Sequence, residues 1–190
     1  MDSKKFGKWR DEIAGELAWA NTHFRIWEQL WPTEHTVRII NKFRVFFQTT
    51  RQAHLQQFLL SVSKIMDKRR GSKSIWSLLN AVDNNPSLLQ NKPLDTHQLW
   101  VKLDAHNSLI ERIRIHRDKH IAHIDASQSW PDSDIWKKNP VTIGEAKQLM
   151  EDLEDVFNKI STAYDGHVWV LEYLGIDDTT SLINELSDNR

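Results

Sequence analysis

The sequence contains no cysteine among its 190 residues. This absence excludes a disulfide-bonded scaffold, a thiolate zinc site and a cysteine nucleophile. It also agrees with a reducing compartment, so we expect a cytoplasmic protein. Glycine and proline are scarce, with 6 and 5 residues, which is below their average shares of about 7% and 5%. Because residues that break helices are few, long helices are favoured over a turn-rich β fold.

Long apolar runs and an excess of either charge are missing as well. No stretch approaches the roughly 20 apolar residues of a membrane-spanning helix, and the N-terminal residues lack the apolar core of a secretory signal, so we expect no membrane association. The 25 basic and 26 acidic side chains give a formal net charge of −1. Attraction to nucleic acid must therefore come from a local cluster.

Common cofactor motifs are absent too. The sequence has no glycine-rich phosphate loop, no HExxH and no Cys/His finger. Their absence argues against nucleotide hydrolysis by a P-loop and against the commonest zinc enzymes. We expect no cofactor.

Apolar residues recur every three to four positions along most of the chain, which is the period of an amphipathic helix. Helices are predicted over residues 5–31, about 37–66, a short segment that begins after Ser74, about 95–123, about 142–165 behind a Thr142/Glu145 capping box, and about 179–187. The prediction is an all-α bundle of four to five main helices with an extra short C-terminal helix. We expect a single domain over residues 1–190.

Two further segments have alternative interpretations. Residues 125–140 are predicted as an irregular loop, in which Trp130 and Trp136 either cap the core or stack on unpaired bases. A basic segment, residues 64–73, is either a solvated loop at a helix end or a contact for the RNA backbone. Its cations are Lys64, Lys68, Arg69, Arg70 and Lys73.

The densest group of ionisable side chains is ERIRIHRDKHIAHID, residues 111–125, at the end of the predicted 95–123 helix. At about 100° per residue, Arg117 projects from the apolar face of this helix. A guanidinium is costly there unless it is paired or faces a groove. His116, His120 and His123 share a neighbouring face, because spacings of three, four and seven residues bring helical side chains together.

Three interpretations of this cluster are open. Arg117 can form a buried pair with an acid on another helix, with the histidines at the edge of the core. His116, His120 and His123 can bind a metal ion, since their spacing permits it. The third interpretation is metal-free cleavage of RNA by its own 2′-hydroxyl. Histidine supplies an acid or base near neutral pH for this reaction, and arginine supplies a planar cation for the phosphate oxygens.

Arg117-Asp118, separated from His123 by four residues, resembles the R-polar-x-H signature of HEPN domains. The string RDKHIAHID is similar to the AbiU-type (abortive-infection) branch of these domains. So are residues 59–82 (LLSVSKIMDKRRGSKSIWSLLNAV) and residues 141–160 (VTIGEAKQLMEDLEDVFNKI). The resemblance covers about residues 37–165, and leaves the 5–31 helix and a C-terminal extension, 166–190, outside it.

The resemblance implies a helical bundle that commonly forms a homodimer, with two Arg…His motifs facing each other across one cleft. Active HEPN domains are metal-independent endoribonucleases, often toxins or phage-defence effectors, while others are inactive binding domains. Carried over, Arg117 would hold the scissile phosphate and His123 would be the general acid or base. Asp118 would orient one of them through a hydrogen bond, and His120 is a second candidate for the acid or base.

We therefore expect an endoribonuclease that acts on RNA in phage defence or in a toxin–antitoxin setting, where an antitoxin protein would be a further partner. Lys119, Arg114 and Arg112 would contact the RNA backbone. The alternatives are a non-catalytic, dimeric interaction module and, third, a metal-binding bundle.

Overall fold

The computed structural model describes residues 2–34, 36–118, 133–172 and 177–188, and within these ranges the chain forms helices and no β-strand. This confirms the all-α prediction. The α-helices of the described ranges are α1 (Ser3–Gln29), α2 (Val37–Lys42), α3 (Arg44–Ile65), α4 (Ile75–Asn84), α5 (Thr96–Asp104), α6 (Asn107–His116), α7 (Ser133–Lys138), α8 (Ile143–Asp165) and α9 (Asp178–Asp188), and a 3₁₀ turn lies at Pro86–Leu88.

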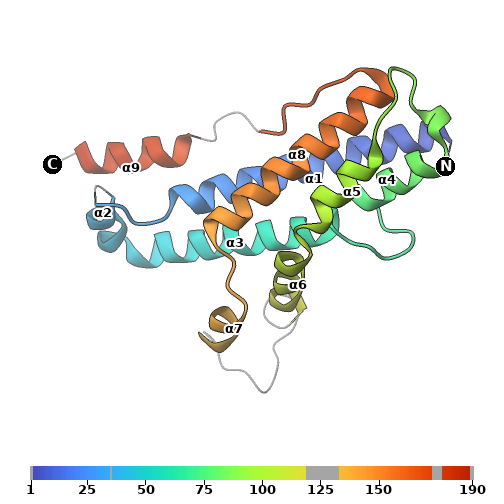
Figure 1. Ribbon diagram of the computed structural model, residues 1–190. Coiled ribbons are helices and arrows are strands. Elements are labelled where there is room, and N and C mark those ends of the chain that lie inside the picture. The colour runs from blue at the N-terminus through green and yellow to red at the C-terminus, as the bar shows by residue number, and fades with distance from the viewer. Residues whose placement is uncertain (1, 35, 119–132, 173–176, 189–190) are drawn as a thin grey trace.

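Two long helices, α1 and α3, lie side by side, and α8 crosses α1 and packs against it (Figure 1). The apolar stripe predicted over residues 5–31 faces α3. The ring centres of Phe24 and Trp27 lie 5.5 and 6.3 Å from the ring centre of Phe58 on α3. Each large apolar side chain that is fully buried contributes about 1.5–3 kcal/mol. The α1–α3 contact therefore supplies much of the stability of the bundle.

Polar caps set several helix ends, as the sequence predicts. Ser74 caps α4, and Thr142 and Glu145 form the reciprocal capping box of α8. Gly166 ends α8 with a φ of 85°, in the left-handed region that glycine adopts without steric cost.

The helix predicted over 37–66 is divided at Phe43, where φ is −114° and ψ is 43°. In an unbroken helix Phe43 would lie between Ile40 and Phe47 on one stripe. The break instead turns Phe43 towards solvent, while Ile40 and Phe47 remain buried. The prediction of one helix was therefore wrong here.

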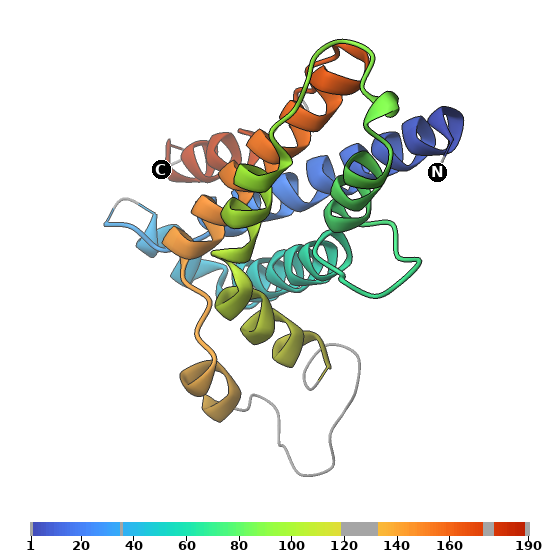
Figure 2. The ribbon, with the colours of Figure 1, turned by 45° about the vertical axis from the view of Figure 1, so that its right-hand side comes forward.

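The helix predicted over 95–123 is also divided, between α5 and α6. Residues 105 and 106 form a turn in which His106 Nε2 lies 2.8 Å from Asp152 Oδ2 on α8, and Asn107 Nδ2 donates to Asp104 Oδ1 at 3.0 Å. These side-chain contacts stabilise the turn and change the direction of the chain. As a result α6 projects away from the layer that holds α5 (Figures 1 and 2).

A second, smaller core lies beside α2, where α9 packs on α1 and α2. Its buried members are Leu30, Ile39, Ile40, Phe47 and Ile183. In the part of the chain that the structure describes, no helix combines the length and the apolar character needed to cross a bilayer.

Candidate functional site

Arg117 and Asp118 are the predicted catalytic residues that the structure describes. The backbone of Arg117 keeps the helical conformation at the end of α6, with φ of −57° and ψ of −50°. Arg117 Nε donates to Asp118 Oδ1 at 2.7 Å. Lys119, His120 and His123 lie outside the described residues, so their roles stay predictions.

The Arg117 side chain is 29% exposed and lines a groove of about 480 Å³. We call this space the Arg117 groove. Its other lining residues come from α3 and from the segment that joins α3 to α4: Leu60, Ser63, Lys64, Asp67, Arg69, Ser72 and Lys73. The structure thus brings the basic segment 64–73 against the end of α6. Arg117 therefore faces a groove whose lining is mostly polar, with Leu60 as its aliphatic member.

Asp67 holds the basic segment in one conformation. Its carboxylate accepts hydrogen bonds from the backbone N–H of Arg69 at 3.0 Å and from Arg69 Nε at 2.8 Å. The side-chain bond from Arg69 lowers the pKa of Asp67, so the carboxylate is ionised at neutral pH. Ser72 Oγ donates to the carbonyls of Asp67 and Arg69, and Gly71 adopts a φ of 87°. The Arg69 guanidinium is therefore fixed, although the side chain is 81% exposed.

Three further cations of the basic segment also have acidic neighbours. Lys64 pairs with Glu16 at 3.0 Å, Lys68 with Asp104 at 3.0 Å, and Lys73 with Glu12. Exposed ion pairs contribute only about 0–1 kcal/mol each. An entering anion can therefore displace these carboxylates at small cost.

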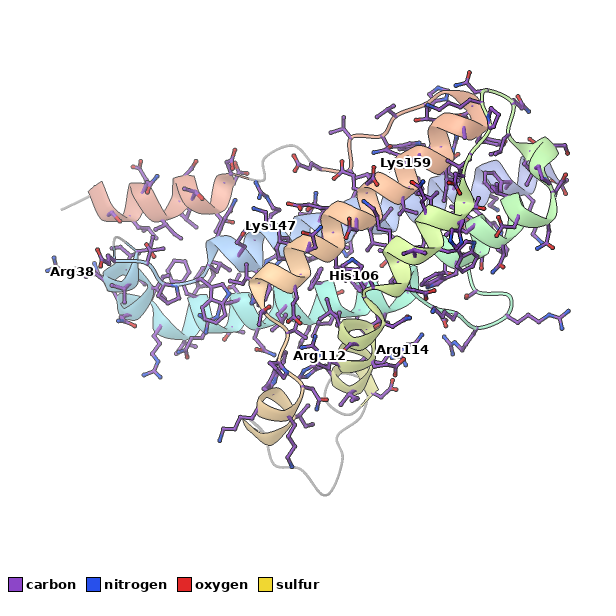
Figure 3. The ribbon with its side chains drawn as sticks, in the orientation of Figure 1. Arg38, His106, Arg112, Arg114, Lys147 and Lys159 are labelled. Carbon is purple, nitrogen blue, oxygen red and sulfur yellow. The ribbon has the colours of Figure 1, made fainter. Side chains whose placement is uncertain are left out.

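Arg112 and Arg114, both predicted to contact RNA, differ in their surroundings. Arg112 forms an ion pair with Glu145 and donates to the carbonyl of Pro140, so it joins α6 to the start of α8. Arg114 lies on the other side of α6 (Figure 3) and pairs with Glu111. Its positive charge also contributes to the low pKa of Asp67. By position, Arg114 suits a ligand in the Arg117 groove better than Arg112 does.

A second groove of about 340 Å³ runs along α4 and shares Asp67 and Arg69 with the Arg117 groove. Trp76 lies in its wall, with the Nζ of Lys68 4.1 Å from the ring centre. The amide side chains of Asn80 and Asn84 also line this groove. The two grooves are neighbours on the segment between α3 and α4.

His116 is fully buried and connects α6 to α7. Its Nε2 donates to the carbonyl of Asn139 at 2.6 Å, and its ring stacks on Trp136 with 3.8 Å between centres. Trp136 lies in α7 and packs against the core, so the prediction of an irregular loop was wrong at 133–138. Trp130 lies outside the described residues.

The metal interpretation needs His116 together with His120 and His123. Within the ranges that the structure describes, no group of three His, Cys, Asp or Glu side chains could hold a metal ion. Because two of the three histidines lie outside those ranges, the interpretation stays untested.

One ionisable pair escaped the sequence analysis. His23 on α1 and His54 on α3 meet with 2.7 Å between their Nδ1 atoms. Burial lowers the pKa of His23 to about 4, and the nearby His54 adds to this effect. The only signal in the sequence was the position of His23 beside the apolar stripe of α1, and its partner depends on the alignment of two helices.

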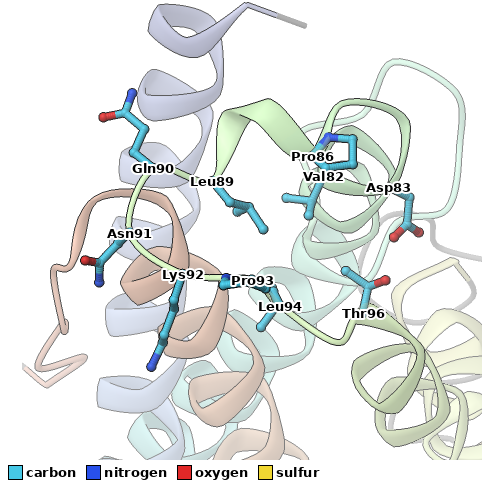
Figure 4. Close-up of a pocket in the computed structure, with 10 residues that line it drawn as sticks. All are labelled: Val82, Asp83, Pro86, Leu89, Gln90, Asn91, Lys92, Pro93, Leu94 and Thr96. Atoms are coloured by element: carbon cyan, nitrogen blue, oxygen red, sulfur yellow. The ribbon is translucent and has the colours of Figure 1, made fainter.

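A cavity of about 490 Å³ lies at the C-terminal end of α4, beside the segment that leads to α5. Figure 4 shows Val82, Leu89 and Leu94 around it, with Asp83 and Thr96 towards one edge. Asp83 accepts a hydrogen bond from the indole of Trp100 at 2.8 Å. The cavity shares no lining residue with the Arg117 groove and offers no acid–base pair.

An all-α bundle with an Arg-Asp pair at a helix end agrees with the resemblance to HEPN domains. A model of the AbiU2 family of HEPN domains matches residues 3–182. The chain therefore belongs to the AbiU2 family. No curated protein and no solved structure matched it.

The family match takes in more of the chain than the three resembling blocks. It begins in α1 and ends in α9, outside the 37–165 region that carried the resemblance. Membership confirms the fold class and is consistent with an abortive-infection role.

Proposed function

We propose that the chain is a metal-independent endoribonuclease of phage defence or of a toxin–antitoxin pair. In this reaction the 2′-hydroxyl of a ribose loses its proton to a base and attacks the adjacent phosphorus. The bond from phosphorus to the 5′-oxygen breaks, and that oxygen takes up a proton. The products are a 2′,3′-cyclic phosphate and a 5′-hydroxyl, and no cofactor is consumed.

The observation that supports this proposal most is the meeting of Arg117 with the basic segment in one groove. A planar guanidinium can donate two parallel hydrogen bonds to a phosphate. Arg117 would hold the scissile phosphate, with Asp118 at its Nε keeping the guanidinium oriented. Arg69, Lys73 and Arg114 would contact neighbouring phosphates.

His123, or His120 in second place, would move the proton, and Lys119 would contact the backbone. A homodimer would bring two such sites into one cleft, so that the histidine of one protomer can serve the phosphate held by the other. The groove along α4 would extend the path of a single strand beyond the scissile bond.

The test is cleavage of a mixture of single-stranded RNAs in excess EDTA, with analysis of the product ends. Wild-type protein should leave 2′,3′-cyclic phosphates. Arg117→Ala and His123→Ala should each reduce the rate by a factor of about 10²–10⁴, the usual contribution of one such group. Arg117→Lys should restore little, because an ammonium cannot form the paired bonds.

Arg38→Ala and His97→Ala are matched controls, since both side chains are exposed and lie outside the groove residues. They should cleave like wild type. Loss of activity on adding EDTA would refute the metal-free mechanism.

A non-catalytic interaction module is the second candidate. It is favoured by the carboxylates that already pair with Lys64, Arg69 and Lys73, which weaken the pull on phosphate. Intact RNA in every reaction, with harmless expression in cells, would support this alternative.

A further inference from the structure

The corner between α2 and α3 presents apolar side chains to solvent. Phe43 is 41% exposed, Phe46 is 58% exposed and Val45 is 79% exposed. We call these three residues the apolar corner. It lies at the start of α3, whereas the Arg117 groove lies at the end. Since α3 has 22 residues and rises about 1.5 Å per residue, the two surfaces are separate.

The apolar corner is surrounded by cations. The sequence has no Asp or Glu between residues 35 and 66. Arg38, Lys42 and Arg44 are exposed and form no ion pair within the described part of the chain. Lys42 Nζ lies 5.4 Å from the centre of the Phe43 ring. A surface that is both apolar and cationic suits a partner that is both apolar and anionic.

α9 is an example of a helix that packs at this end of the bundle. It contains three acidic and no basic residues, and it buries Ile183 against Ile39, Ile40 and Phe47. An acidic amphipathic helix therefore already packs beside α2 (Figure 1). Phe46 contacts the ring of Phe47, with 5.3 Å between centres, so the apolar corner continues directly from the surface that α9 covers.

A second copy of this chain suits the apolar corner poorly. A two-fold axis places the same patch on both sides of an interface. The cations Arg38, Lys42 and Arg44 would then lie opposite the same three cations of the other copy, and like charges would oppose each other across the interface.

We propose that the apolar corner binds an acidic amphipathic helix of another protein. Apolar residues of that helix would cover Phe43, Val45 and Phe46, and its carboxylates would meet the three surrounding cations. This surface is independent of the proposed RNA cleavage, so either proposal can fail without the other.

The probe is a fluorescein-labelled 18-residue peptide of Leu, Ala and Glu, with Leu at helical spacing, and its binding to the full chain is measured by fluorescence anisotropy. Wild-type protein should bind it more weakly as salt is raised. The double variant Val45→Ser/Phe46→Ser should lose affinity on the order of tenfold, as expected when central apolar contacts are removed. Arg44→Glu should show a comparable loss that grows at low ionic strength.

Matched controls are Val168→Ser/Val170→Ser, which removes two other exposed valines, and Lys147→Glu, which reverses an exposed charge on α8. Both should bind like wild type, and circular dichroism should show that all variants keep their helices.

Four results would overturn the proposal. The first two are that the acidic peptide does not bind, or that a matched Lys peptide binds equally well. The third is that the wild-type protein is a dimer and that Val45→Ser/Phe46→Ser dissociates it. The fourth is that Arg44→Glu weakens the binding of an RNA oligonucleotide but leaves the binding of the peptide unchanged.

Discussion

Replacing His23 by asparagine tests the electrostatics of the contact between α1 and α3. The His23 ring is buried, its Nδ1 faces His54, and its Nε2 has no hydrogen-bond partner among the described residues. A protonated ring would carry N–H groups on both nitrogens, so the charged form is disfavoured in the folded protein. Asparagine keeps a polar atom near the position of Nδ1 and cannot become charged.

The direction of the effect follows from the lowered pKa of His23, from 6.5 to about 4. Between these values the unfolded chain binds a proton that the folded protein does not. The stabilisation is therefore complete above pH 6.5 and is lost as the pH falls towards 4. At 1.36 kcal/mol per pH unit, the wild type should lose about 2 kcal/mol more than His23→Asn between pH 7 and pH 5.

Urea unfolding at a series of pH values, followed by circular dichroism, gives both free energies of unfolding. The comparison is between the pH slopes of the two proteins, because asparagine also leaves a small cavity that lowers stability at every pH. His97→Asn is the control, since that ring is exposed at the start of α5. Parallel slopes for wild type and His23→Asn would refute this reasoning.

Three further substitutions test the contacts that hold the bundle together. Thr142→Ala removes one half of the capping box and should lower the free energy of unfolding by about 1 kcal/mol. Asp165→Asn removes one of the two carboxylates that pair with the buried Arg10 and should cost about 1.5–3 kcal/mol, the usual contribution of a hydrogen bond to a charged group, while Asp11 still pairs with the guanidinium. Phe157→Ala empties a fully buried site on α8 and should cost about 3–5 kcal/mol.

The same urea titration at pH 7 measures all three. Thr49→Ala and Asp177→Asn are the respective controls for the first two, since both side chains are exposed, and each should change stability by less than about 0.5 kcal/mol. If Thr142→Ala or Asp165→Asn matched its control, the corresponding contact would not stabilise the fold. A loss below about 1 kcal/mol for Phe157→Ala would contradict the close packing around α8.

Helix ends could be predicted wherever the signal was local. Ser74 and the Thr142/Glu145 box are caps whose partners lie three residues away, so the pattern alone identifies them. The breaks at Phe43 and His106 could not be found in this way. The apolar period continues through both positions, and the second break depends on Asp152, which lies on another helix.

The candidate site could likewise be predicted only in part. Arg117 was singled out because a cation on an apolar face needs a reason. That the basic segment would supply the other side of its groove depends on how α6 leaves α5, which only tertiary contacts determine. The His23–His54 pair likewise requires the alignment of α1 against α3.

The glutamates on α1 give the Arg117 groove counterions of its own. Glu12 and Glu16 pair with Lys73 and Lys64 in the free protein, and in the proposed complex with RNA these acids would stay close by. Affinity for RNA should then fall less steeply with added salt than the number of cations in the groove suggests, because fewer phosphates are fully neutralised. Recognition would rest on the shape of the groove and on Arg117 more than on long-range attraction.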